Sequence, residues 1–193
     1  MTDAPLDPIA IDVGEVLQRT VTSLYAHLIT RPTGRAVRMA IETRLEGAGR
    51  RSLSLIDFSE VVLIDFSCAD EVVAKLLQKY RDSEVHQAYF VFRGVHEPHR
   101  DQVESVLERQ GLAAVVEVEP GTFRLLGVHT PDEARAWRLV EERGMLSADE
   151  VSDVFAAHDA RAALESLGRR GLAYRSPESG RVHALSRLVR HLM

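Results

Sequence analysis

Residues 52–80 read SLSLIDFSEVVLIDFSCADEVVAKLLQKY, and this stretch decides the fold. Residues 52–58 are apolar enough to predict a strand that is buried on both faces. A second short apolar run follows at residues 61–64. From residue 69 onward, apolar residues recur at intervals of three and four, which predicts a long amphipathic helix. A buried strand followed by such a helix is typical of α/β proteins.

The start of this helix carries the most distinctive polar residues. Ser67 is followed three residues later by Asp70, a spacing close to a capping box, which predicts Ser67 as the N-cap. Glu71 and Lys75 are expected to pair on the solvent-exposed side. Cys68 lies in the first turn, where a helix dipole lowers the pKa of a thiol. Since the sequence supplies no adjacent His or second Cys, we expect Cys68 to be a small packed residue.

Strands and helices alternate on both sides of this stretch, up to residue 128. We expect further strands at residues 9–13, 88–92, 113–118 and 123–128, and helices at 15–29, 35–46 and 98–110. Pro98 fits the first turn of the last of these helices. Residues 1–8 hold two prolines and no periodicity, which indicates a loose, flexible leader. The predicted fold class is therefore α/β.

The pattern changes after residue 131. We expect helices at residues 132–143, 147–155 and from 159 to about 170, then short strands at 172–175 and 181–184. A turn-rich loop joins the two strands into a hairpin, and a closing helix follows. Each half has its own set of apolar residues. The sequence therefore predicts two domains, 9–129 and 130–193, that fold independently.

The composition is that of an ordinary globular protein. The 193 residues are 45% hydrophobic and 27% charged, with a formal net charge of −5. Residues 161–193 hold seven Arg against two Glu, a net charge of +5, so residues 1–160 carry −10. A single cysteine excludes an internal disulfide. No apolar run approaches the roughly 18 residues of a membrane span, and the first ten residues lack a signal-peptide pattern, so we expect a cytoplasmic protein.

The segment 56–71, IDFSEVVLIDFSCADE, resembles the signature of STAS domains, the fold of anti-sigma-factor antagonists. It is closest to a STAS-like branch in which the helix begins with Ala-Asp-Glu. The resemblance covers about residues 34–118 and implies a STAS-like mixed sheet with helices. The residues that carry the motif are Asp57, Asp65, Phe66, Ser67 and Cys68.

In the family that this segment resembles, the motif contains the site of a phosphorylation switch. In anti-sigma-factor antagonists, a kinase phosphorylates a Ser directly after the second Asp of the motif, and Phe66 stands at that position here. A phenyl ring cannot accept phosphate, and Ser67 is the nearest hydroxyl. Ser67 is either a displaced phospho-acceptor at a helix N-terminus or a structural cap. Asp57 and Asp65 are expected to satisfy turns at strand ends rather than to form an acid–base pair.

An Arg-rich segment precedes the motif, as it does in the STAS-like branch. It reads TRPTGRAVR at residues 30–38 and contains Arg31, Arg35 and Arg38. These arginines surround a helix start that contains a glycine, which is a place where anions bind. The alternative is a solvated basic face.

Residues 164–175, LESLGRRGLAYR, resemble the winged helix-turn-helix domains of bacterial regulators. In such domains the third helix enters the major groove of DNA and the hairpin, or wing, meets the phosphate backbone. The resemblance implies DNA contacts by Arg161, Arg169, Arg170, Arg175 and Arg181. Acidic residues on the same helices, among them Asp159 and Glu165, favour the alternative that this domain docks a protein.

The two halves together predict a non-catalytic bacterial regulatory protein. The STAS-like domain would relay a signal by protein contact, and the winged helix would deliver it to DNA. The alternative is a protein-only partner-switching adaptor. The sequence contains no Walker loop, Gly-x-Ser-x-Gly or Gly-x-Gly-x-x-Gly motif, so we expect no enzymatic activity, cofactor or metal. The oligomeric state, the upstream signal and the operator stay open.

Overall fold

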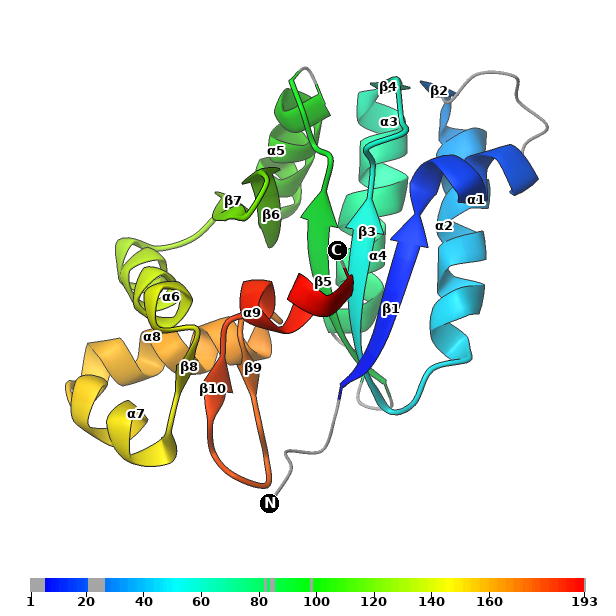
Figure 1. Cartoon of the computed structure of the whole chain (residues 1–193). Coiled ribbons are helices and arrows are strands. Elements are labelled where there is room, and N and C mark those ends of the chain that lie inside the picture. Colours follow the sequence, from blue (N-terminus) through cyan, green and yellow to red (C-terminus); the bar gives the residue numbers. More distant parts are fainter. Residues whose placement is uncertain (1–5, 21–26, 82, 84–85, 98, 193) are drawn as a thin grey trace.

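The centre of the molecule is a five-stranded sheet with the strand order β1-β3-β5-β6-β7 (Figure 1). The computed structural model describes residues 6–20, 27–81, 83, 86–97 and 99–192. The strands are β1 (Asp7–Asp12), β3 (Arg51–Asp57), β5 (Gln87–Arg93), β6 (Ala113–Glu119) and β7 (Thr122–Gly127). The first four are parallel, and β7 pairs antiparallel with β6. The predicted α/β class is confirmed.

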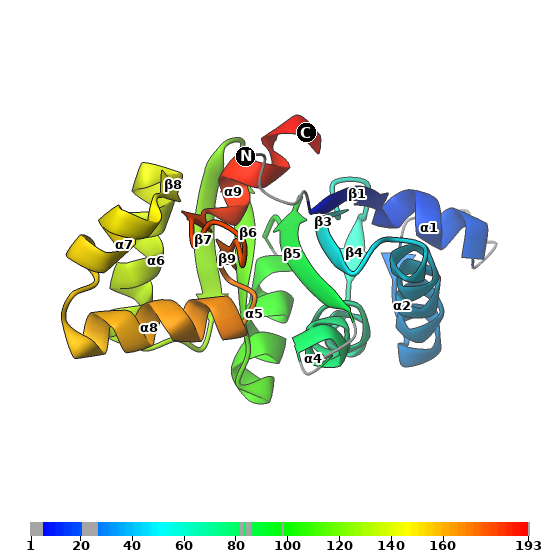
Figure 2. The same ribbon diagram turned by 90° about the horizontal axis from the view of Figure 1, so that it is seen from below.

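The helices of the first half cover one face of this sheet. They are α1 (Val13–Thr20), α2 (Arg31–Glu46), α3 (Phe66–Ala69), the π-helix η1 (Asp70–Lys75), α4 (Leu76–Arg81) and α5 (His99–Gln110). Successive parallel strands are added in one direction across the sheet, so right-handed crossovers put their connections on the same side. Figure 2 shows α2, α4 and α5 together on that side. Their apolar residues form the first core with Ile56, Phe92 and Val116 of the sheet.

Two predicted helix boundaries in this half are wrong. Of the helix expected at residues 15–29, the structure describes α1 (Val13–Thr20) and, at the far end of the same stretch, strand β2 (His27–Leu28), which pairs in parallel with β4 (Leu63–Ile64). Residues 21–26 of that expected helix, among them Val21, Leu24 and Tyr25, lie outside the described residues. Helix α2 begins at Arg31, four residues before the predicted start, because Pro32 fits the first turn of a helix.

Two residues that were expected in the leader lie in a strand instead. Asp7 and Pro8 belong to β1, which pairs along its whole length with β3. Residues 1–5 and Pro98 lie outside the described residues.

The C-terminal segment contains three helices, a hairpin and a closing helix, as predicted. Its elements are α6 (Pro131–Arg143), β8 (Met145–Leu146), α7 (Ala148–Val154), α8 (His158–Arg169), β9 (Tyr174–Arg175), β10 (Val182–His183), α9 (Leu185–Val189) and the 3₁₀-helix η2 (Arg190–Leu192). The sequence did not predict β8, which joins the hairpin in a small sheet with the order β8-β10-β9. None of the helices within the described ranges is long and apolar enough to cross a bilayer.

This segment covers the second face of the five-stranded sheet. Leu53, Leu55 and Val91 on that face are at most 2% exposed, and they belong to one apolar cluster with Trp137 and Leu167 of the C-terminal helices. In Figure 2, α9 lies on the side of the sheet opposite α2, α4 and α5, and it contacts β3 and β5. The prediction that each half has a separate core is therefore wrong. The helices of the first half cover only one face of the sheet, and the C-terminal segment buries the other face.

Candidate functional site

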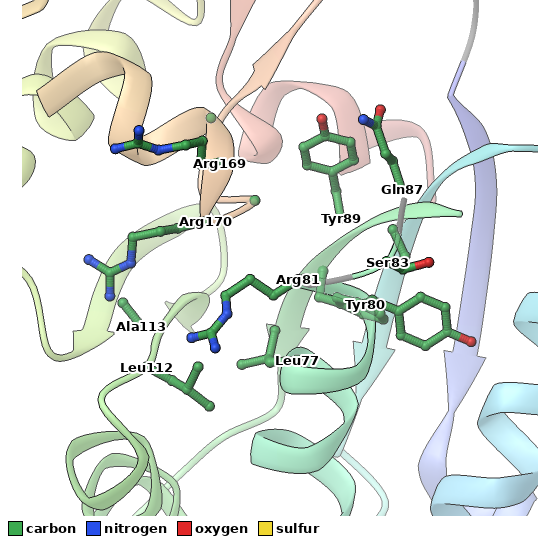
Figure 3. A pocket seen from close by; sticks show the side chains of 14 residues that line it. Leu77, Tyr80, Arg81, Ser83, Gln87, Tyr89, Leu112, Ala113, Arg169 and Arg170 are labelled. Atoms are coloured by element: carbon green, nitrogen blue, oxygen red, sulfur yellow. The ribbon is translucent and has the colours of Figure 1, made fainter. Parts of the chain in front are cut away.

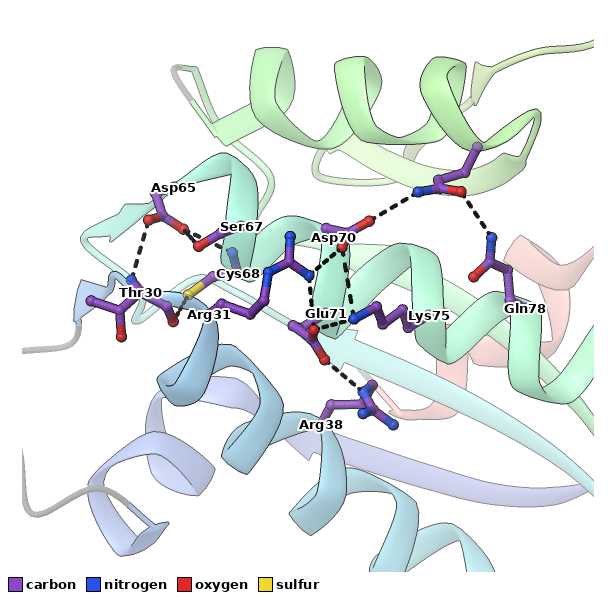
Figure 4. A network of polar contacts seen from close by, with 11 residues as sticks. Thr30, Arg31, Arg38, Asp65, Ser67, Cys68, Asp70, Glu71, Lys75 and Gln78 are labelled. Carbon is purple, nitrogen blue, oxygen red and sulfur yellow. Dashed lines mark hydrogen bonds and ion pairs between the residues drawn. The ribbon is translucent and has the colours of Figure 1, made fainter.

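Asp65 connects the starts of two helices (Figure 4). It is the N-cap of α3, and its Oδ1 accepts hydrogen bonds from the Cys68 N–H at 2.8 Å and the Ser67 hydroxyl at 2.9 Å. Its Oδ2 accepts a bond from the N–H of Thr30, which precedes α2, at 3.2 Å. Burial raises the pKa of Asp65, but these hydrogen bonds outweigh burial and hold the pKa below its usual range. The prediction that Ser67 is the N-cap is wrong, because Ser67 is the second residue of the helix and donates to the true cap.

Cys68 is a packed residue, as predicted. Its side chain is fully buried, and Sγ donates a hydrogen bond to the Thr30 carbonyl at 3.0 Å. Burial and the nearby carboxylate of Asp65 raise the pKa of the thiol to about 12, so it is not a nucleophile near neutral pH. A Cβ on Gly34 of α2 would lie 2.8 Å from the Cys68 Cα. The close contact between α2 and α3 therefore requires glycine at that position.

Asp57 takes part in a different set of contacts at the end of β3. It accepts a hydrogen bond from the Ser59 N–H at 2.8 Å and pairs with the Arg93 Nε at 3.1 Å. Asp57 and Asp65 thus each accept backbone hydrogen bonds beside their own strand end, as expected.

We expect Asp65→Ala to lower the free energy of unfolding by about 2 kcal/mol, the upper end for an N-cap, because Asp65 also holds the start of α2. Ser67→Ala should lower it by less than about 1 kcal/mol, since one partly exposed hydrogen bond is lost. Urea unfolding followed by circular dichroism measures both. A larger loss for Ser67→Ala than for Asp65→Ala would contradict the assignment of the cap.

A cluster of ion pairs next to this cap joins α2 to the continuous helix at residues 66–81 (Figure 4). Glu71 is only 1% exposed and accepts hydrogen bonds from Arg31 at 2.9 Å, from Arg38 at 3.2 Å and from Lys75. Burial raises the pKa of Glu71, but the hydrogen bonds from these three cations outweigh burial and lower the pKa. Asp70 accepts a further bond from Arg31 at 2.6 Å.

The π-helix η1 contributes to the burial of two adjacent carboxylates. A π-helix has more residues per turn than an α-helix, so successive side chains point in more similar directions. Asp70 and Glu71 accordingly both face Arg31 of α2. The predicted Glu71–Lys75 pair is confirmed, but its placement on the solvent-exposed side is wrong, because Glu71 lies between the two helices.

The three arginines of the Arg-rich segment do not form one site. Arg31 binds Asp70 and Glu71, and Arg38 binds Glu42 and Glu71. Arg31 and Arg38 therefore fit neither prediction, the anion site or the solvated face, because the anions that they bind are carboxylates of the same chain. Arg35 is exposed and makes no ion pair with the part of the chain that the structure describes, as expected for a solvated face.

The second candidate site is the exposed side of α8 and the neighbouring strand β9. Arg161 and Arg169 are exposed on α8, and Arg175 is exposed on β9. Two adjoining hollows border α8; Arg161 lines the first, Arg169 lines the second, and Glu165 and Arg175 line both. We call this surface of three arginines and one glutamate the α8 groove. Arg181 is exposed at the start of β10.

Arg170 is engaged inside the protein. Its Nη1 donates to Glu133 of α6 at 2.8 Å, and its Nη2 donates to the Val128 carbonyl at 2.5 Å. Glu133 is 5% exposed and also accepts a hydrogen bond from Ser166 at 2.6 Å. Arg170 therefore fixes the end of α8 to α6, and this contact removes it from the set of arginines that face a partner.

The sequence did not predict the contacts that attach the hairpin to the large sheet. At the start of β3, Arg51 donates through Nη2 to Glu178 at 2.9 Å and through Nη1 to the Tyr174 hydroxyl at 3.3 Å. The Tyr174 ring packs edge-on against Tyr89 of β5, with 5.4 Å between the centroids. The hydrogen bond from Arg51 lowers the pKa of Glu178. No local spacing could have signalled these contacts, because Arg51 and Glu178 are 127 positions apart.

At the first site the cations, carboxylates and the Ser67 hydroxyl are paired with one another, whereas the arginines of the α8 groove are exposed. Nowhere in the described ranges do three or more His, Cys, Asp or Glu side chains form a group that could hold a metal ion. Comparison of the chain with models of protein families, with curated proteins and with solved structures finds no match in any of the three.

Proposed function

We propose that the chain is a non-catalytic regulatory protein. In this proposal residues 9–129 are a STAS-like domain that relays a signal by protein contact, and residues 130–193 are a winged helix that delivers the signal to DNA. The order of α6, β8, α7 and α8, followed by a hairpin, supports the second part, because winged helices combine three helices with a small hairpin sheet. The position of Asp65 and Phe66 at the start of a helix supports the first part.

The α8 groove is the observation that most directly supports the proposal. Helix α8 is the third helix of its segment, which is the position of the DNA-reading helix in a winged helix-turn-helix. Three arginines and a single glutamate give the groove a net positive charge. Arginines on such a surface neutralise DNA phosphates and release their counterions.

We expect the full chain to bind duplex DNA at low salt, with an affinity that falls steeply as salt rises. Arg175→Ala should weaken binding to all sequences alike and reduce the salt slope by about one, because one phosphate contact is lost. Arg161→Ala should instead relax sequence preference, by about 1–3 kcal/mol for a bidentate guanine contact. Fluorescence anisotropy at several salt concentrations measures both effects. Arg35→Ala removes the same charge from the exposed side of α2 and is the matched control.

Absence of binding at low salt, or equal behaviour of Arg175→Ala and Arg35→Ala, would favour the second candidate function, a protein-only adaptor. One observation favours that candidate. A hollow between α6, α7 and α8 combines apolar residues, among them Leu139 and Val154, with the charged Asp132, Arg135 and Asp159, and Val154 is 41% exposed. Exposed apolar side chains around a hollow are typical of protein-docking surfaces.

The relay through the first half is expected to work without phosphorylation at the motif. Phe66 has no hydroxyl, and a phosphate on Ser67 would lie against Asp65, whose Oδ1 is 2.9 Å from the Ser67 hydroxyl. Phosphopeptide analysis of the protein from its native cells tests this expectation. Stoichiometric phosphate on Ser67 would overturn it and would indicate a kinase partner.

A further inference from the structure

The side chain of Arg51, at the start of β3, attaches the hairpin β9–β10 to the large sheet. Its guanidinium donates to both carboxylate oxygens of Glu178, at 2.9 Å and 3.4 Å, and to the Tyr174 hydroxyl at 3.3 Å. Two parallel bonds between a guanidinium and a carboxylate fix the orientation of both groups as well as their distance. Glu178 lies in the loop of the hairpin and Tyr174 in its first strand, so Arg51 holds the hairpin at two points.

The same carboxylate takes part in the hydrogen bonds within the hairpin loop. Oε2 of Glu178 accepts a bond from the Ser176 hydroxyl at 3.2 Å, and the Ser176 Oγ accepts one from the Ser179 N–H at 3.2 Å. The Gly180 N–H donates to the Ser176 carbonyl at 2.9 Å. Glu178 therefore connects the hydrogen bonds of the loop to Arg51, and loss of Arg51 is expected to loosen the loop.

The base of the hairpin is packed, whereas its loop is exposed. Tyr174 is buried against Tyr89 of β5. Figure 3 shows Tyr89 and Gln87 pointing away from α4, toward the side of the sheet that carries the C-terminal segment. Glu178 is exposed and Arg51 is half-buried, so the pair between them can open while the base of the hairpin stays in place.

We propose that Arg51 is the contact through which the first half of the chain controls the hairpin. Paired with Glu178, it keeps the loop ordered and balances the negative charge at its tip. Without the pair, the loop opens more often and its tip carries an unbalanced carboxylate. Arg51 is a positioning residue in this role, because it acts through Glu178 and not by contact with a ligand.

The consequence for DNA binding rests on the proposed function, in which the hairpin is the wing that meets the phosphate backbone. Glu178 stands between Arg175 and Arg181 in the sequence, at the tip of that wing. An unbalanced carboxylate there repels phosphates, and the repulsion falls as salt rises. Withdrawal of Arg51 from Glu178 by a change in the first half would therefore weaken DNA binding.

Amide hydrogen exchange, measured residue by residue on the full chain by NMR, tests the control of the hairpin without DNA. In Arg51→Ala, the amides of residues 179–180 should exchange about threefold faster or more, because the loop loses a charge-assisted contact. The Gly121 N–H, which donates to Glu117 at the opposite end of the sheet, should exchange at the wild-type rate. Arg35→Ala removes an exposed arginine from α2 and should change neither rate.

Fluorescence anisotropy with duplex DNA at low salt tests the charge. We expect Glu178→Gln to bind most tightly, and the double variant Arg51→Ala/Glu178→Gln to bind about as tightly as the wild type. Arg51→Ala alone should bind about threefold more weakly than the wild type, because one negative charge at the tip is unbalanced. The differences should shrink at high salt, since charges on an exposed loop are screened.

Equal exchange of residues 179–180 in the wild type and in Arg51→Ala would overturn the proposal, and so would an equally large change at Gly121. A double variant that binds DNA as weakly as Arg51→Ala would show that only packing was lost, and would overturn the role given to the charge of Glu178. If none of the proteins binds DNA but the hairpin exchanges faster in Arg51→Ala, the proposed function falls and the control of the hairpin by Arg51 stands.

Discussion

Residues 130–193 alone should show no cooperative unfolding transition, whereas the full chain should unfold in a single transition. Leu185 and Val189 of α9 are at most 1% exposed and belong to the cluster that includes Leu53 and Val91 of the large sheet. Burial of one such side chain contributes about 1.5–3 kcal/mol. Exposing several of them would exceed the few kcal/mol by which a domain of about 60 residues is stable.

Tryptophan fluorescence measures this result directly, because Trp137 is the only tryptophan and lies in the same cluster. In urea, the full chain should give coincident transitions by fluorescence and by circular dichroism, which is the signature of one cooperative unit. A sigmoidal fluorescence transition in the 130–193 fragment would contradict the shared core and would support two domains that fold independently. Residues 1–129 alone should aggregate, because Leu53, Leu55 and Val91 would be exposed.

Glu71→Gln is expected to be the most destabilising single substitution among the polar residues discussed. The variant keeps the size of the side chain but leaves Arg31, Arg38 and Lys75 facing one another without their shared carboxylate. Removal of one partner from a buried ion pair costs 3–5 kcal/mol as a rule. We expect about 3 kcal/mol, because the side chains of Arg31 and Lys75 are 49% and 40% exposed and can turn toward water. Urea unfolding at neutral pH provides the measurement.

The pH dependence of this difference is an independent expected result. The pKa of Glu71 in the folded protein lies below its ordinary value of 4.5, so the unfolded chain binds the proton first as pH falls. The stability that Glu71 contributes is therefore fully present above about pH 4.5 and is lost as pH falls through the folded pKa. The difference between wild type and Glu71→Gln should shrink over that window. The exposed Glu108→Gln on α5 is the control, and an equal loss for both variants would refute the buried network.

The sequence by itself determined the elements whose stabilising contacts are local. The helix expected at residues 147–155 is present as α7, and its start is held by a capping box between Ser147 and Glu150. The dense apolar run at residues 52–58 predicted a strand buried on both faces, and β3 is such a strand. These signals depend on neighbours within a few positions, so a single sequence contains them completely.

The candidate sites were predictable only in part for the same reason. The motif at residues 65–68 pointed to a helix start, but the cap is Asp65 rather than Ser67, because the Asp65 carboxylate accepts the Cys68 N–H. The same carboxylate accepts the N–H of Thr30, 35 positions earlier, which no local pattern indicates.

The resemblance to winged helices pointed to Arg161 and Arg169, which are exposed on α8. The engagement of Arg170 by Glu133 was not predictable, since these residues are 37 positions apart.

Only the tertiary structure decided which polar groups are buried, and that the two halves of the chain share a core. Arg31 and Arg38 find their carboxylates on a helix more than 30 positions away, because the crossover places α2 beside η1. The strand order put the helices of the first half on one face of the sheet, and the bare face then required the C-terminal segment as its cover. Such contacts depend on how distant elements are arranged in space, and no local pattern of residues specifies that arrangement.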